Sequence, residues 1–194
     1  MMKIKKIVLI ALSIVVFALQ SFADTWHVYN GASIQDVIDI ASNGDIIHVY
    51  SYYTGYEGFD FDGKSLEICC EGYPRPIING DLSSPSLGIV IDMTYIDNPS
   101  VAPPKLHGFK IIGSSTAIGV KLTNFDGLSP AKIYNNVIDG LGTAIYVGDN
   151  QKRIEITLNE LLNNDYAYYS IETSANQGFP DYFHYNIVYD NDYG

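Results

Sequence analysis

Cysteine is scarce in this 194-residue chain, and its scarcity excludes a class of protein. The only two cysteines, Cys69 and Cys70, are adjacent. Neighbouring strand residues point to opposite faces, so these two cannot easily form a disulfide. A disulfide-stapled small domain is therefore excluded, and an exported chain of this kind must be held by its core. The pair predicts one buried small side chain and one outward thiol, because no further metal ligands or redox partners stand out nearby.

Positive charge is also scarce, with 11 Lys and Arg against 22 Asp and Glu. Removal of residues 1–23 would take away Lys3, Lys5 and Lys6, and the net charge would change from −11 to 8 − 22 = −14. Nucleic acid and anionic membrane need positive charge facing them, so neither is predicted as a partner. A polyanionic glycan would be repelled unless a cation bridged the two. Neutral or cationic ligands suit this charge better.

The one long hydrophobic run lies at the start of the chain. Basic "MMKIKK" precedes apolar residues 7–19, and "SFA" supplies small residues before a cut after Ala23. The run is short for a bilayer span, so residues 1–23 are predicted to be a cleaved signal peptide. We expect no membrane insertion after cleavage. The predicted localisation is secreted, periplasmic or cell surface.

One helix is predicted, at residues 33–43 within an N-terminal cap spanning 24–44. Ser33 and Asp36 form a capping box, apolar residues follow at helical spacing, and Gly44 supplies a left-handed stop. The remainder, 45–194, consists of short β-type runs separated by Gly, Asn, Asp and Pro.

An internal repeat is clear from about residue 104. Asn136, Asn159 and Asn186 mark equivalent positions, with Phe109 in an earlier copy, at spacings of 27, 23 and 27 residues. The apolar columns lie three residues before this origin and two, nine and eleven residues after it: Leu106, Ile133, Ile156, Phe183; Ile111, Ile138, Leu161, Val188; Ile118, Ile145, Tyr168; Val120, Val147, Ser170. Residues two apart share an inward strand face, and the break in parity predicts a tight corner just before the origin. Short strands without intervening helices predict an all-β coil of parallel strands, a solenoid.

The repeats "KIYNNVIDGLGTAIYVGD" and "IEITLNELLNNDYAYYSIE" resemble the coils of the right-handed parallel β-helix, the pectin lyase-like family. The stretch from "SIQDVIDIASNG" to "PIING" looks like the N-terminal part of exported members. The resemblance implies a right-handed parallel β-helix whose short helix caps the N-terminal end. It also implies that Asn136, Asn159 and Asn186 form the internal asparagine ladder of the family, from which Phe109 departs. This scaffold carries both enzymes and non-catalytic surface proteins.

The motifs of pectic enzymes with this fold are missing from the sequence. No Asp-Asp pair, G-H-G or R-I-K pattern occurs, and "PRPIING" lacks the second arginine of R-x-P-x-x-R. Acids are plentiful, but the sequence does not identify two carboxylates facing each other across one groove. The catalytic residues stay unknown, and the interpretation leans away from an enzyme.

No metal or cofactor site is predicted. Asp60 with Asp62, and Asp190 with Asp192, resemble calcium loops faintly, but they lack the further oxygen ligands and closing Glu that such a loop needs. They are interpreted as ordinary turns. The four histidines do not cluster in the sequence; His107 and His184 share a column but lie three coils apart, about 14 Å.

Tyrosine is abundant, with 16 residues. Tyr146 and Tyr169 fall ten residues after the origin in consecutive copies, so they should point outward and stack one coil apart. Exposed aromatic ladders can hold sugar faces, and Tyr146 and Tyr169 are the predicted carbohydrate-binding residues. Alternatively, they only stabilise the sheet as a cross-strand pair. The spacers 121–132 and 171–182 are where further binding residues would be displayed.

The sequence therefore favours a secreted or surface-exposed β-helix domain that binds, or is displayed toward, extracellular polysaccharide without catalysis of its own. Two alternatives stay open: the N-terminal fragment of a polysaccharide lyase or glycoside hydrolase, and a structural stalk or adhesin segment. The final "DNDYG" matches a turn that leads into a strand in the preceding copy. We expect further coils beyond residue 194 and a C-terminal end that is truncated.

Overall fold

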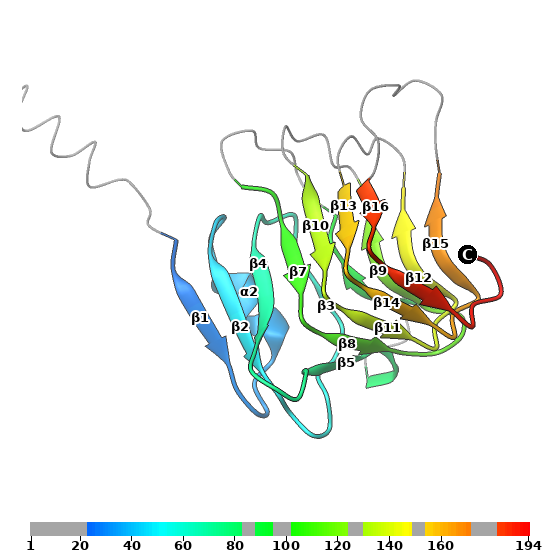
Figure 1. Ribbon diagram of the computed structural model, residues 1–194. Coiled ribbons are helices and arrows are strands. Elements are labelled where there is room, and N and C mark those ends of the chain that lie inside the picture. Colours follow the sequence, from blue (N-terminus) through cyan, green and yellow to red (C-terminus); the bar gives the residue numbers. More distant parts are fainter. Residues whose placement is uncertain (1–22, 83–87, 95–101, 124–129, 149–153, 172–181) are drawn as a thin grey trace, which may run out of the picture.

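The computed structural model describes residues 23–82, 88–94, 102–123, 130–148, 154–171 and 182–194, and the predicted signal peptide lies almost wholly outside them. Over these residues the protein is all-β apart from one short helix and one 3-10 turn, and its paired strands run parallel (Figure 1). The strands form three sheets, which we call A, B and C. The prediction of an all-β chain with parallel strands is confirmed.

Sheet A has seven strands: β1 (Thr25–Val28), β2 (Ile46–Tyr50), β4 (Glu67–Glu71), β7 (Lys105–His107), β10 (Ala131–Tyr134), β13 (Ile154–Thr157) and β16 (Tyr182–His184). Sheet B has five: β5 (Ile77–Asn79), β8 (Lys110–Ile112), β11 (Val137–Asp139), β14 (Glu160–Leu162) and β17 (Ile187–Tyr189). Sheet C has five: β3 (Phe59–Asp60), β6 (Ile89–Asp92), β9 (Ile118–Leu122), β12 (Thr143–Val147) and β15 (Tyr166–Ser170).

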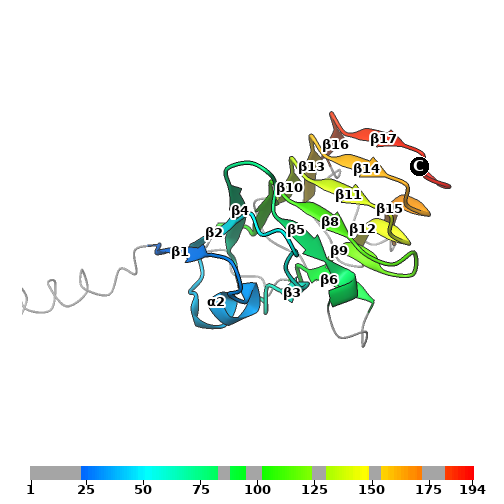
Figure 2. The same cartoon turned by 90° about the horizontal axis from the view of Figure 1, so that it is seen from below.

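The chain visits the three sheets in a fixed rotation. From β4 onward it passes from A to B to C and returns to A, and we call one such passage a circuit. The 3-10 turn η1 (Gly80–Leu82) follows β5 within one of these circuits. Each strand pairs with its counterpart one circuit later, so the circuits stack along the molecule, with helix α2 at the end opposite the C-terminus (Figure 2).

The core consists of three in-register rows of apolar side chains, one from each sheet. The following members of the rows are all fully buried: Ile47, Ile68, Leu106, Ile133 and Ile156 in sheet A; Ile78, Ile111, Ile138 and Leu161 in sheet B; Ile91, Val120 and Ile145 in sheet C. Burying one such side chain stabilises the fold by roughly 1.5–3 kcal/mol. In the last circuit Phe183 and Val188 continue two of these rows but are 39% and 38% exposed, since β16 and β17 are edge strands.

Two predicted columns, nine and eleven residues after the origin, are wrong by two residues in the earliest copy, and Leu122 rather than Val120 pairs with Val147. Val120, not Ile118, pairs with Ile145, and Ile118 pairs with Thr143 and is only half-buried. The reason is the connection from sheet B to sheet C, which takes five residues between β8 and β9 but three between β11 and β12. A shift of two keeps the parity of the strand, so Val120 still points inward.

The corner between sheets A and B uses left-handed backbone at the residue just before the repeat origin. The φ values there are +90° at Gly108, +57° at Asn135, +59° at Leu158 and +59° at Tyr185. The corner lies where the change of parity predicts it. The asparagines at the origin itself are not left-handed, so their role in the corner is not conformational tolerance.

Their role is hydrogen bonding in the interior. Asn159 is fully buried, and its Oδ1 accepts from the backbone N–H of Asn136 at 3.0 Å and from the Asn136 amide at 3.1 Å. Its Nδ2 donates to the carbonyl of Ile133 at 2.9 Å and to Oδ1 of Asn186 at 3.1 Å. The ladder begins at the backbone of Phe109, whose N–H donates to Asn136 Oδ1 at 3.0 Å.

A second asparagine ladder lies at the corner between sheets B and C, and the sequence interpretation did not identify it. The N–H of Leu141 donates to Oδ1 of Asn164 at 3.0 Å, and the N–H of Asn164 donates to Oδ1 of Asn191 at 2.9 Å. The Asn164 amide also donates to the carbonyl of Ile138 at 3.1 Å. The two ladders therefore use the same chemistry at two successive corners.

Helix α2 (Ile34–Ile40) is shorter than the predicted span 33–43. Ser33 is the N-cap, and its hydroxyl accepts from the N–H of Asp36 at 3.1 Å. The helix ends at its C-cap, Ala41, whose backbone is extended, and Lys64 Nζ donates to the carbonyls of Ile38 and Asp39 in the last turn, at 2.7 and 2.9 Å. The predicted stop, Gly44, lies in a later turn with a φ of +94°.

We predict that Asn159→Ala destabilises the protein strongly. The substitution leaves the carbonyl of Ile133 and the N–H of Asn136 without these side-chain partners in the interior. The free energy of unfolding should fall by about 3 kcal/mol. Urea denaturation measures it, with Glu160→Ala as the control, because Glu160 is the next strand residue and only half-buried. Equal losses in both variants would contradict the proposed role of the ladder.

We predict that Leu158→Asn stabilises the protein. Leu158 is 60% exposed and holds a left-handed φ of +59°, which Asn adopts at lower cost than Leu. The free energy of unfolding should rise by roughly 0.5–1 kcal/mol, measured in the same denaturation experiment. A lower free energy of unfolding would contradict the prediction, because it would show that packing of the Leu158 side chain outweighs the cost of its left-handed backbone.

Candidate functional site

The outer face of sheet C carries a row of side chains from five successive strands. Asp60, Asp92, Lys121, Tyr146 and Tyr169 are in register, one from each of β3, β6, β9, β12 and β15. Adjacent members are one strand spacing apart, about 4.8 Å. The row changes character along its length, with charged groups on the first three strands and aromatic rings on the last two. We call it the sheet C row.

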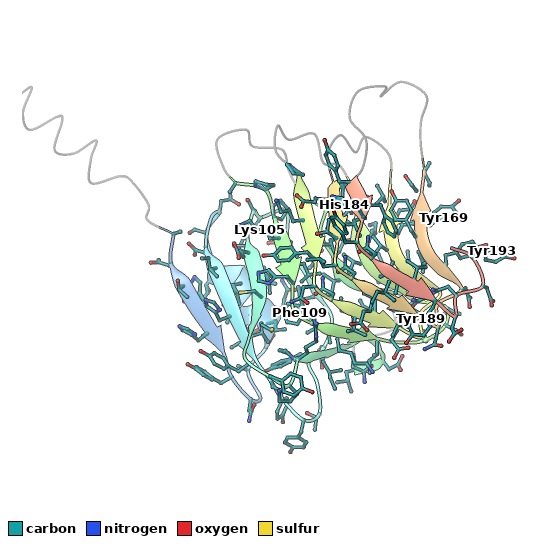
Figure 3. All side chains as sticks on the ribbon, in the orientation of Figure 1. Lys105, Phe109, Tyr169, His184, Tyr189 and Tyr193 are labelled. Carbon is teal, nitrogen blue, oxygen red and sulfur yellow. The ribbon has the colours of Figure 1, made fainter. Side chains whose placement is uncertain are left out.

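Tyr146 and Tyr169, the residues predicted for carbohydrate binding, stack on each other. Their ring centroids are 5.7 Å apart with an interplanar angle of 14°. Tyr169 is 44% exposed and Tyr146 is half-buried. Tyr166 meets Tyr169 edge-on at 5.8 Å and stacks on Tyr193 at 4.7 Å. Figure 3 shows Tyr169 and Tyr193 at the C-terminal end of the molecule, projecting outward from the ribbon.

The charged part of the sheet C row is already engaged in contacts within the protein. Lys121 Nζ lies 3.0 Å from Asp92 Oδ2, and the backbone N–H of Thr94 donates to Asp92 Oδ1 at 2.9 Å. Asp60 Oδ1 accepts from the N–H of Asp62 at 2.7 Å. Burial is the main cause that raises the pKa of Asp60, with Asp92 adding to it. Asp92 therefore lies between the Lys121 ammonium and Thr94, whose hydroxyl also donates to Oδ1.

The Asp60–Asp62 segment is a turn, as interpreted from sequence. Its hydrogen bond runs from a backbone N–H two residues on to a carboxylate, and Asp62 and Gly63 have φ values of +53° and +69°. The centres of the two predicted display spacers, residues 124–129 and 172–181, lie outside the described residues.

The outer face of sheet A carries a second row, which sequence reasoning missed. The register aligns seven side chains: His27, His48, Cys69, His107, Tyr134, Thr157 and His184. All four histidines of the chain thus belong to one row, and the interpretation that they do not cluster is wrong. His107 and His184 are indeed three strands apart, but His27 and His48 lie on adjacent strands, with ring centroids 5.5 Å apart.

The densest chemistry in this row is around Cys69. Cys69 Sγ lies 3.4 Å from His48 Nδ1 on the preceding strand. Glu67, two residues before Cys69 on the same strand, has its Oε1 3.2 Å from His107 Nε2 on the following strand. The ligand-type atoms of Glu67, Cys69 and His107 all lie within 4.8 Å of one another. We call Glu67, Cys69, His107 and His48 the β4 cluster.

The cysteine prediction is therefore partly wrong. Cys69 and Cys70 are not bonded to each other. Cys69 lies on the outer side of sheet A, yet it is only 4% exposed, since His48 and His107 flank it on the neighbouring strands. Cys70, with the parity of the core residue Ile68, is half-buried. Cys69 is thus both outward-facing and buried, and the sequence did not reveal its neighbours His48 and His107.

The protonation of the β4 cluster favours neutral imidazole and ionised carboxylate. Burial lowers the pKa of His107 and outweighs the hydrogen bond that its ring donates to Glu67, which acts the other way. Burial alone would raise the pKa of Glu67, but the contacts with Lys105 and His107 lower it below its ordinary value. Burial also raises the pKa of Tyr134 to about 12, with contributions from Glu67 and Cys69. In the Glu67–His107 contact the Nε2–H of a neutral ring thus donates to the ionised carboxylate.

The sequence carried a weak signal for this cluster. Glu67 and Cys69 alternate within one strand, which predicts a shared face. His107 is in the repeat, whereas β1, β2 and β4 precede the repeat and share no column with it. Only the register could show that His48 and His107 are the two neighbours of Cys69.

Among the described residues, no helix has the length and apolar character needed to cross a membrane. Comparison of the chain with models of protein families, with curated proteins and with solved structures finds no match.

Proposed function

We propose that the chain is a right-handed parallel β-helix, exported by its N-terminal segment, whose outer face binds extracellular polysaccharide. The circuits of three parallel strands, the in-register core rows and the two asparagine ladders support the β-helix. The basic start, the apolar residues 7–19 and the small residues before Asp24 support export. The N-terminal helix α2 packs beside β1, β2 and β3, as a cap on the first circuit would.

The binding surface is the sheet C row, and the observation that carries it is the stacked Tyr146–Tyr169 pair. Two parallel rings at 5.7 Å present an aromatic strip to the outside along the stacking direction. Tyr rings combine apolar faces with a hydroxyl, which suits the apolar face and polar rim of a sugar. Asp92 and Lys121, farther along the row, supply a hydrogen-bond acceptor and donors. An extended chain of sugars would lie along the row, across the strands.

The ligand should be uncharged. The chain without residues 1–23 carries a net charge of 8 − 22 = −14, so a polyanionic glycan meets repulsion over the whole molecule. A neutral polysaccharide meets none, and its affinity should depend little on salt.

A structural role is the second candidate, and the same tyrosines favour it. Each stacked pair joins neighbouring strands in register: Tyr146 with Tyr169, and Tyr166 with Tyr193. Cross-strand aromatic pairs stabilise sheets by about 0.2–1 kcal/mol each. In a stalk or display segment this stabilisation would be their whole contribution.

Glycan binding separates the two functions. We predict that Tyr146→Ala and Tyr169→Ala each weaken binding to a neutral polysaccharide about tenfold, since each removes about 1.4 kcal/mol of ring contact. Tyr146→Phe keeps the ring and should bind nearly as well as the parent chain. A neutral-glycan array followed by calorimetry on the bound glycan makes the measurement.

The matched control is Tyr29→Ala, which removes a tyrosine from another stacked pair, with Tyr50, on the side of sheet A. It should leave glycan binding unchanged. If the parent chain binds no neutral glycan, or if Tyr29→Ala weakens binding as much as Tyr146→Ala, the sheet C row is not a carbohydrate site.

Export makes a separate prediction. Expressed in a bacterial host, the chain should leave the cytoplasm and begin at Asp24, because cleavage is expected after Ala23. Mass spectrometry of the exported fraction checks this. Val15→Arg places a charge in the apolar run and should leave the precursor inside the cell, whereas Lys3→Arg keeps the basic start and should be exported normally. An exported chain that still begins at Met1 would contradict the proposal.

A further inference from the structure

The β4 cluster gathers four side chains that are common ligands of transition metals. Glu67 and Cys69 are two residues apart on β4, so both project to the outer face of sheet A. His48 and His107 are the in-register partners of Cys69 on β2 and β7. The thiol is therefore flanked by an imidazole on each side at one strand spacing, about 4.8 Å, with a carboxylate beside it.

We propose that Glu67, Cys69, His107 and His48 bind one divalent transition-metal ion of the Zn²⁺ class. Nothing in the proposed polysaccharide function requires this site, which lies on a different sheet. The proposal rests on the ligand types, their mutual distances and their burial.

Two of the ligand separations match the edges of a tetrahedral site. Bonds of about 2.1 Å to nitrogen or oxygen and 2.3 Å to sulfur place nitrogen and oxygen ligands about 3.3 Å apart, and nitrogen and sulfur ligands about 3.6 Å apart. The observed separations are 3.2 Å between His107 Nε2 and Glu67 Oε1, and 3.4 Å between His48 Nδ1 and Cys69 Sγ. The remaining separations within Glu67, Cys69 and His107 are at most 4.8 Å, so Cys69 and the Glu67–His107 pair need to approach by about 1 Å to share one ion, with His48 following Cys69 as the fourth ligand.

Neighbouring side chains hold two of the ligands in place. Lys105 Nζ binds the other oxygen of Glu67, Oε2, at 2.6 Å, which leaves Oε1 turned toward His107. Tyr134 stacks on the His107 ring with centroids 4.2 Å apart and an interplanar angle of 15°. The Lys105 hydrogen bond and the Tyr134 stacking orient the two ligand side chains, as neighbours of metal ligands commonly do. The His48 ring is likewise stacked on His27, at an angle of 17°.

The ligand set selects the metal class. A thiolate and two imidazoles are soft or borderline ligands that suit Zn²⁺ and its analogue Co²⁺, whereas Ca²⁺ and Mg²⁺ need oxygen ligands. Four protein ligands fill a tetrahedral shell, which is typical of a structural site. The alternative use of a Cys–His pair is nucleophilic catalysis, but Cys69 is only 4% exposed and a substrate could not reach its sulfur. The bound ion would join β2, β4 and β7.

Cobalt titration of the reduced, purified chain tests the proposal. We expect one Co²⁺ per chain, with a thiolate-to-cobalt charge-transfer band and the strong visible bands of tetrahedral Co²⁺. Zn²⁺ should displace it and raise the unfolding temperature by about 5 °C or more when present at a hundred times its dissociation constant. Cys69→Ser should abolish the charge-transfer band, and His107→Gln should weaken Co²⁺ binding at least about tenfold.

Cys70→Ser is the matched control, because it removes the neighbouring thiol from the opposite face of the same strand. It should keep the band and the one-to-one stoichiometry. Circular dichroism establishes that each variant is folded; if Cys69→Ser does not fold, His107→Gln and Glu67→Gln decide the result. The proposal is overturned if the folded parent chain shows no thiolate-to-cobalt band, if Cys69→Ser retains it, or if folded His107→Gln and Glu67→Gln bind Co²⁺ as tightly as the parent.

Discussion

Buried corners leave backbone N–H and C=O groups that the flat sheets cannot pair, and asparagine side chains supply their partners. Asn159 shows how: its side-chain amide accepts from Asn136, the preceding rung, and donates to the carbonyl of Ile133 and to Asn186, the next rung. Without such partners each buried group would cost about 1–3 kcal/mol. Because each rung bonds the rung one circuit away, the ladders also fix the register between the circuits that they join, from Phe109 onward.

Because the register is fixed, side chains at equivalent positions of successive strands align in rows along the surface. Residues that are 21 to 38 positions apart become neighbours at one strand spacing, and each circuit contributes one side chain to a row. In sheet C this produces an acidic and basic stretch that ends in stacked tyrosines. In sheet A it brings Cys69 between His48 and His107. The two proposed sites therefore have one structural origin, although their chemistry and their expected ligands differ.

Much of the repeat could be predicted from the sequence, because its columns reflect local parity and recur. The outward stacking of Tyr146 on Tyr169 needed only equal spacing between two copies, and this pair of copies has it. Ile118 was misplaced because one connection between sheets B and C is two residues longer, a difference that local pattern does not register. The helix also ends before the predicted stop, and its last turn is capped by Lys64, 24 residues after Ile40, a contact that the local sequence pattern does not show.

The sequence by itself determined the class of structure: β-strands with inward apolar residues at a period of two, corners at turn residues, and a strongly acidic surface. These depend on local backbone preferences and on composition, which do not require knowledge of distant neighbours. Tertiary structure alone decided which side chains meet. The β4 cluster depends on the pairing of β2, β4 and β7, which precede or begin the clear repeat, and such pairing is set by the packing of the whole core rather than by any one segment.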